Sequence, residues 1–200
     1  MIDTLSALTL FAFVSSVTPG PNNLMLLSSG TRFGFRRTIP HMLGIAVGFV
    51  LMIVLVGLGL ARLFEVFPQL QLALTIASVA YLLFLAWKIA TAKAPATGDE
   101  TVAGKPLTFL QAAAFQWVNP KAWTMALTAL SAYMPRTDPW TGIVIVAAVC
   151  GMVNLPSVSV WAAMGSQMRR FLAEPRKLRA FNLTAAALLV VSLYPTIAHG

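Results

Sequence analysis

Hydrophobic residues occur in long runs that are separated by short polar or basic stretches. A helix needs about 20 apolar residues to cross the ~30 Å hydrocarbon layer of a membrane. Six runs come close to this length, and they predict membrane-spanning helices at 4–27, 40–61, 69–91, 107–133, 140–166 and 181–198. The last run is the shortest, so its insertion is the least secure of the six. The pattern therefore predicts an all-α membrane protein with six transmembrane helices.

The basic residues lie mainly in alternate connections between these runs. The first, third and fifth connections hold eleven of the 14 Lys and Arg residues, whereas the second and fourth hold only Arg62 and Arg136. Positively charged loops stay on the cytoplasmic side of a membrane. We therefore expect both termini in the periplasm, and an even number of spans satisfies this alternation.

Composition agrees with a single polytopic membrane domain over residues 1–200. The chain is 58% hydrophobic and 10% charged, whereas soluble domains carry about 25% charged residues. The net charge of +8 does not indicate a nucleic-acid partner, because the basic residues lie between apolar runs. One cysteine, Cys150, allows no disulfide framework. The expected surroundings are the lipid bilayer of a bacterial inner membrane.

The first predicted span is interrupted by Thr18-Pro19-Gly20-Pro21-Asn22-Asn23. Proline lacks an N–H group and clashes with the preceding turn, and glycine destabilises a helix, so the helix should break here. Inside a bilayer the freed backbone groups have no water to bond. Such a break is tolerated only where it is buried in protein or lines a polar cavity.

A second interruption, Gln116-Trp117-Val118-Asn119-Pro120-Lys121, lies in the fourth predicted span. Pro19 and Pro120 are 101 positions apart, and the polar linker 92–106 divides the chain into halves of about 1–91 and 107–200. Three spans per half make the second half enter from the opposite face. This predicts a 3+3 inverted repeat in which broken helices 1 and 4 meet near the midplane. Two plain proline kinks are the alternative.

A third interruption is predicted in span 5, at Asn154-Leu155-Pro156. Gln116 lies one turn before the Asn119 break and is expected to face the same cavity. For both, simple kinking and interhelical hydrogen bonding remain the alternative. Gly44 and Gly48 are spaced to let another helix approach closely. His41 lies near the cytoplasmic end of span 2, where a polar residue at the membrane interface is expected.

These residues resemble the LysE/RhtB family of amino-acid exporters over nearly the whole chain. The resemblance rests on Thr18–Asn23, Leu27-Ser28-Ser29, Gly34-Phe35-Arg36, Gly44, Gly48 and Asn119-Pro120-Lys121. Within the family, the cysteine and O-acetylserine exporters are most similar, at 85–91, 128–131, Asn154 and Trp161. The resemblance implies export of a small amino acid across the inner membrane, with the proton gradient as the expected driving force.

We expect the substrate to be bound at the two breaks and on the fifth span. The candidate binding residues are Pro19, Gly20, Pro21, Asn22, Asn23, Gln116, Asn119, Pro120, Lys121, Asn154 and Trp161. Lys121 could attract the substrate carboxylate, or it could extend its side chain to the cytoplasmic headgroups. The asparagines could bind the two charged groups of a zwitterion, or they could cap their own broken backbone. Both roles can coexist.

The predicted spans contain no Asp or Glu. A carrier of basic amino acids would need a buried anion, so a neutral substrate is expected, either cysteine/O-acetylserine-like or threonine/homoserine-like. The spans then offer no carboxylate that could carry a proton, so His41 or the substrate itself would have to carry it.

No zinc-binding helix, nucleophile elbow or aspartate pair is present, so we expect no enzyme, no catalytic or metal site and no cofactor. A basic amino-acid exporter, a channel and a membrane protein without transport activity stay open, as do the coupling ion and a homo-oligomer.

Overall fold

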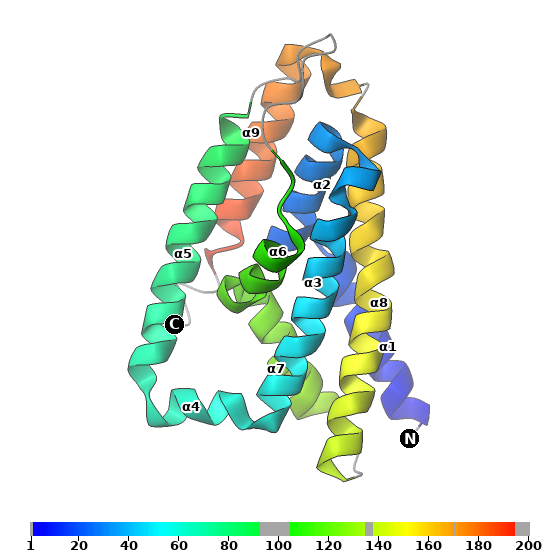
Figure 1. The fold of residues 1–200 in the computed structure, drawn as a ribbon, viewed down its shortest axis with the longest axis vertical. Helices are drawn as coiled ribbons and strands as arrows, with labels where there is room; N and C mark the ends of the chain where they lie inside the picture. Colours follow the sequence, from blue (N-terminus) through cyan, green and yellow to red (C-terminus); the bar gives the residue numbers. More distant parts are fainter. Residues whose placement is uncertain (1, 93–104, 135–137, 170, 195–200) are drawn as a thin grey trace.

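A computed structural model describes residues 2–92, 105–134, 138–169 and 171–194, and these residues are almost entirely helical, with no strand among them (Figure 1). The α-helices are α1 (Ile2–Val17), α2 (Pro21–Phe33), α3 (Phe35–Leu55), α4 (Ala61–Val66), α5 (Pro68–Ala90), α6 (Phe109–Phe115), α7 (Pro120–Tyr133), α8 (Pro139–Met168) and α9 (Pro175–Val191). A π-helical turn, Val56–Leu60, joins α3 to α4, and two 3-10 turns are formed by Gln116–Val118 and Phe171–Ala173.

Three helical segments within the described residues are long and apolar enough to cross a membrane, namely Phe35–Leu60, Gln69–Ala90 and Pro139–Met168. They coincide with the predicted spans 40–61, 69–91 and 140–166. The predicted spans 4–27 and 107–133 are each divided between two shorter helices, because the chain leaves helical geometry at 18–20 and at Asn119. The predicted span 181–198 corresponds in its described part to α9, which already begins at Pro175.

The first predicted connection, 28–39, is wrong in its secondary structure. Residues on both sides of Gly34 are helical, and Gly34 alone separates α2 from α3. Its φ of 79° lies in the left-handed region that favours glycine. The polar side chains that suggested a loop are satisfied inside the protein: the Thr31 hydroxyl bonds the carbonyls of Leu27 and Gly165. Of the predicted linker 92–106, residues 93–104 lie outside the described part.

The third predicted break, at Asn154-Leu155-Pro156, is also wrong. Helix α8 continues through Pro156 as one helix of 30 residues. A single proline removes only one main-chain donor, and transmembrane helices tolerate it when nearby Ser side chains bond the backbone. The hydroxyl groups of Ser157 and Ser159 donate to the carbonyls of Val153 and Leu155 at 2.8 and 2.7 Å. No second proline or glycine adjoins Pro156 to open the helix further.

The helices form an elongated bundle in which α8 packs along α1, α2 and α3, while α5 and α9 pack together on another side (Figure 1). Helices α6 and α7 connect the two groups, because α6 contacts α3 and the turn after it contacts α5. Buried apolar residues from α1, α3, α7 and α8 make the largest core cluster. A second cluster joins α2, α5, α6 and α9, and a third joins α2, α3, α6 and α8.

Glycines permit the closest helix contacts. Gly165 of α8 lies against the Leu27 carbonyl of α2, and Gly30 of α2 lies against the Ala162 carbonyl of α8. Gly44 and Gly48 of α3 face the backbone of α6, as their spacing predicts. Any side chain at these positions would push two backbones apart.

We predict that Gly165→Ala destabilises the folded protein by about 1–3 kcal/mol, the usual cost of overpacking. Its new methyl group would meet the Leu27 carbonyl, which is backbone and cannot turn aside. Gly151→Ala in the same helix is the control, because its methyl group would meet only a side-chain methyl of Val50. The thermal midpoint in detergent should fall clearly further for Gly165→Ala, and equal midpoints would contradict the prediction.

Candidate functional site

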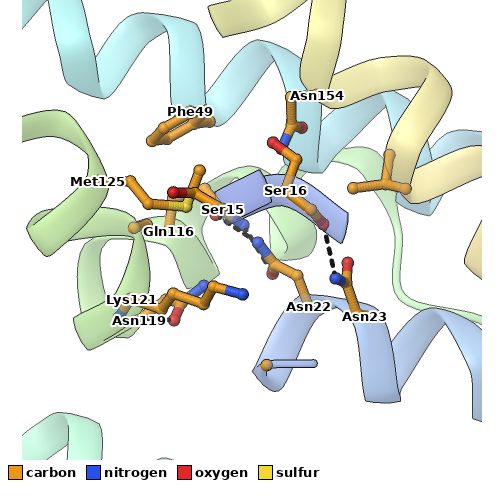
Figure 2. A pocket seen from close by; sticks show the side chains of 13 residues that line it. Ser15, Ser16, Asn22, Asn23, Phe49, Gln116, Asn119, Lys121, Met125 and Asn154 are labelled. Atoms are coloured by element: carbon orange, nitrogen blue, oxygen red, sulfur yellow. Dashed lines mark hydrogen bonds between the residues drawn. The ribbon is translucent and has the colours of Figure 1, made fainter. Parts of the chain in front are cut away.

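The two breaks lie against each other beside a small cavity (Figure 2). Gly20 and Asn119 are buried there, whereas Thr18 and Pro19 are exposed. The cavity is bordered by residues from α1, α2, α3, α7, α8 and the turn before α7. These residues are Ser15, Ser16, Gly20, Asn22, Asn23, Phe49, Gln116, Asn119, Lys121, Ala122, Met125, Asn154 and Val158. Most of the lining residues are polar, whereas Phe49 of α3, Ala122 and Met125 of α7 and Val158 of α8 are apolar. This agrees with the expectation that unwound backbone borders a polar cavity.

The end of α1 exposes carbonyl groups that lack helical partners, and residues near the break bind several of them. Thr18 donates its main-chain N–H to the Val14 carbonyl at 3.0 Å and its hydroxyl to the Ser15 carbonyl at 3.0 Å. The Asn23 amide donates to the carbonyls of Ser16 and Thr18 at 2.7 and 2.8 Å. Asn23 therefore ties the start of α2 to the end of α1 across the break.

Donors from α7 and α8 bind the remaining carbonyls. The indole N–H of Trp161 donates to the Val17 carbonyl at 3.2 Å. The Lys121 ammonium donates to the Thr18 carbonyl at 2.7 Å and to the Pro19 carbonyl at 3.3 Å, and also to the Thr18 hydroxyl at 2.8 Å. A cation at this position is favourable because the C-terminus of a helix carries partial negative charge. Each carbonyl from residue 14 to residue 19 thus accepts at least one hydrogen bond.

The second break is narrower and satisfies itself. Asn119 is the one residue there outside helical geometry, with φ −96° and ψ 104°. Its side-chain oxygen accepts from the main-chain N–H of Lys121 at 3.2 Å, so Asn119 caps α7, whose first residue is Pro120. The Trp123 indole donates to the Trp117 carbonyl at 2.9 Å. For Asn119, as for Asn23, the capping role left open by the sequence is the one that the geometry displays.

Asn22 and Gln116 join the two breaks directly. Asn22 Nδ2 donates to Gln116 Oε1 at 2.9 Å, and Gln116 Nε2 donates back to Asn22 Oδ1 at 3.2 Å (Figure 2). Gln116 is fully buried and also donates to the Ala112 carbonyl at 2.9 Å. Buried amides are costly unless they are paired, so this reciprocal pair holds two segments together that are 94 residues apart.

The start of α2 differs from the start of α7, because no side chain caps it. Gly20 occupies the N-cap position and Pro21 has no N–H group. Within the described part of the chain, the main-chain N–H groups of Asn22 and Asn23 donate no hydrogen bond, and the first helical bond runs from Leu24 to Gly20. Free N–H groups at a helix N-terminus, together with the helix dipole, form a site for an anion such as a carboxylate.

Asn154 of α8 adds an acceptor to the cavity. Its Nδ2 donates to the Ser16 hydroxyl at 3.3 Å, whereas its buried Oδ1 has no hydrogen-bond partner. A buried carbonyl oxygen without a partner is uncommon. At a cavity wall it is available to a ligand that carries N–H groups.

The cavity measures about 20 Å³, which is room for about one water molecule. An amino acid does not fit into that space. Lys121 is the only charged residue among those that line it. The site therefore has to widen before a molecule of amino-acid size can enter.

The structure brings together most of the predicted binding residues. Those that line the cavity are Gly20, Asn22, Asn23, Gln116, Asn119, Lys121 and Asn154. Pro19, Pro21, Pro120 and Trp161 do not line it, although Pro19 and Trp161 contribute hydrogen bonds to the break. The Lys121 side chain lies against the first break, where its ammonium contacts Thr18 and Pro19.

Sequence reasoning missed Ser15, Ser16, Phe49, Ala122, Met125 and Val158, which also line the cavity. The two serines carried a usable signal, because they are adjacent polar residues just before a helix break. The other four are apolar residues within apolar helices, so nothing in the sequence distinguished them. His41, which does not line the cavity, is 2% exposed, and neither ring nitrogen has a hydrogen-bond partner among the described residues.

We predict that Asn22 and Gln116 are energetically coupled. In a double-mutant cycle of Asn22→Ala and Gln116→Ala, the coupling should be about 0.5–3 kcal/mol, because each single variant leaves the other amide without its partner. Unfolding in detergent would measure it. Pairing Asn22→Ala with Gln111→Ala is the control, because Gln111 lies in the same helix region but caps α6 at Thr108. An additive Asn22/Gln116 cycle would contradict the prediction.

Comparisons with known proteins agree with the resemblance seen in the sequence. The model of the LysE type translocator family matches residues 13–192. Proteins named cysteine/O-acetylserine efflux protein from Escherichia coli O1:K1 / APEC, Escherichia coli strain K12 and Shigella flexneri are 34%, 33% and 33% identical over 187 residues, which cover 93% of this chain and 93% of each relative. No solved structure matches the chain. The match over most of the sequence shows that this protein belongs to the LysE family of translocators.

Proposed function

We propose that this protein is a secondary transporter that exports small neutral amino acids across the bacterial inner membrane. The observation that carries the proposal is the meeting of two broken helices around one polar cavity, with opposite helix ends facing it. Transporters bind substrates near the midplane at such discontinuous helices. The relatives named as cysteine/O-acetylserine efflux proteins favour a substrate of that kind, and a threonine- or homoserine-like substrate fits the same chemistry.

The first break supplies a complementary site for each end of a zwitterion. Carbonyl oxygens at the end of α1, those of Thr18 and Pro19, suit the substrate ammonium. The open N–H groups at the start of α2, those of Asn22 and Asn23, suit the substrate carboxylate. Asn154 Oδ1 offers the ammonium a further acceptor. A single amino acid can therefore span the gap between α1 and α2.

The lining favours a neutral side chain. No acidic residue borders the cavity, and a basic side chain would need a buried anion to offset the cost of its desolvation. Phe49, Met125 and Val158 are the large apolar residues of the lining. A short apolar or weakly polar substrate side chain is suited to them.

The proposed membrane arrangement has six spans. The pairs α1–α2 and α6–α7 each cross the membrane once as an interrupted helix, and α9 is the sixth span. The two halves of three spans have opposite orientations, and they move about the cavity so that it opens to one side of the membrane at a time. Both termini then lie in the periplasm, in accord with the distribution of basic residues. We propose the proton gradient as the driving force, with His41 or the substrate carrying the proton, because the cavity lining contains no carboxylate.

A transport assay tests the function. Inside-out membrane vesicles that contain the protein should take up labelled cysteine or O-acetylserine in a saturable way, and a protonophore should abolish the uptake. Asn22→Ala and Lys121→Ala should reduce uptake to the level of empty vesicles, because each removes a group at the break. Lys88→Ala, which changes an exposed lysine at the end of α5, is the control. Wild-type uptake by either site variant removes that residue from the site, and non-saturable, gradient-insensitive flux would indicate a channel.

A labelling experiment tests the topology. With Cys150, the only cysteine, replaced by serine, single cysteines at Asp3 and Tyr194 should react with an impermeant maleimide in intact cells. Cysteines at Arg36 and Arg169 should react only after the membrane is opened. Labelling of the Arg36 position in intact cells would overturn the proposed orientation.

A further inference from the structure

The inference concerns Lys121 and rests on the proposed function. Its ammonium lies against the end of α1 and is bound by three oxygen atoms, the Thr18 carbonyl, the Thr18 hydroxyl and the Pro19 carbonyl, at 2.7, 2.8 and 3.3 Å. A lysine ammonium has three N–H donors, and here each has an acceptor. The group of oxygens, which we call the carbonyl cradle, is thus complete for one primary ammonium.

The ammonium of an amino acid has the same three donors and the same charge as that of Lys121. It would find its best partners at the same oxygens, because they combine lone pairs with the negative end of the α1 dipole. Both ammonium groups cannot occupy the carbonyl cradle together. The cavity next to it, about 20 Å³ in volume, offers no second place of amino-acid size.

We propose that the Lys121 ammonium occupies the position of the substrate ammonium when no substrate is bound. Lys121 must leave this position before an amino acid binds, and it then pairs with the substrate carboxylate. This exchange of one ammonium for another leaves the net charge of the site unchanged, because a zwitterion has no net charge. An incoming zwitterion gives its ammonium to the carbonyl cradle and its carboxylate to Lys121. An amine without a carboxylate offers no partner to the displaced Lys121. Lys121 is partly buried, and a charged group that is partly removed from water without a partner is unfavourable. The lysine therefore selects zwitterions over simple amines.

Gly20 supports this role independently. Its φ of −173° and ψ of 176° describe extended backbone that any residue adopts, so the backbone does not require glycine there. A Cβ atom at this position would instead lie 2.6 Å from Lys121 Cδ and 3.1 Å from Lys121 Nζ. The absence of a side chain at position 20 leaves the path by which the lysine reaches the carbonyl cradle.

The test measures binding to purified protein in detergent by titration calorimetry under reducing conditions. The two ligands are L-cysteine and its decarboxylated analogue 2-mercaptoethylamine. Wild-type protein should bind the amine much more weakly than cysteine. Lys121→Met empties the carbonyl cradle, so it should strengthen amine binding by about tenfold, as expected when a competing state is removed, and should reduce the preference for cysteine. Lys88→Met removes an exposed lysine in α5 and should change neither affinity.

Gly20→Ala provides a second variant that keeps the lysine and its charge. Its methyl group displaces the Lys121 side chain, so cysteine binding should tighten severalfold while the carboxylate preference remains. If the wild type binds cysteine, two results overturn the inference but not the proposed function. One is unchanged or weaker amine binding by Lys121→Met, and the other is unchanged cysteine binding by Gly20→Ala. Absence of cysteine binding and of transport by the wild type overturns the proposed function, and the inference with it.

Discussion

The structure depends on how the carbonyl groups at the end of α1 find hydrogen-bond partners. A helix that ends in the interior of a membrane protein leaves its last carbonyls without intrahelical donors, and each one that stays unsatisfied costs several kcal/mol. Here the donors come from three other helices: Asn23 of α2, Lys121 of α7 and Trp161 of α8. The break therefore joins α1 to its surroundings instead of weakening the bundle.

The same hydrogen bonds explain why the site has no room for an amino acid. The oxygens best suited to a substrate ammonium are already bound by the protein's own lysine, and the two breaks are tied by the Asn22–Gln116 pair. In the proposed function, an amino acid that enters the cavity exchanges these partners for its own charged groups and creates no new unsatisfied ones. Such an exchange keeps the energy difference between closed and loaded forms small, which a carrier needs if it is to release what it binds.

The two breaks are not chemically equivalent, although each contains asparagine and proline residues. The side-chain oxygen of Asn119 caps α7. The N-cap residue of α2 is Gly20, which has no side chain that could cap the helix. The start of α2 thus keeps open N–H groups, and the second break contributes side chains instead, namely Gln116 and Lys121. The two breaks can in this way provide one backbone site and one pair of side chains at the same cavity.

Sequence alone determined the helical class, the positions of both breaks and most of the cavity residues. Long apolar runs, Pro-Gly-Pro and Asn-Pro carry these signals locally, because proline and glycine act on the backbone of their own segment. Local rules were insufficient at 28–39 and at Pro156. The Thr31 hydroxyl is satisfied inside the protein by the carbonyls of Leu27 and Gly165, and at Pro156 the hydroxyl groups of Ser157 and Ser159 bond the helix backbone one turn earlier. Only the tertiary structure decided which donor meets which carbonyl. That pairing joins residues about 100 positions apart, such as Lys121 and Thr18, and no periodicity within one segment records it.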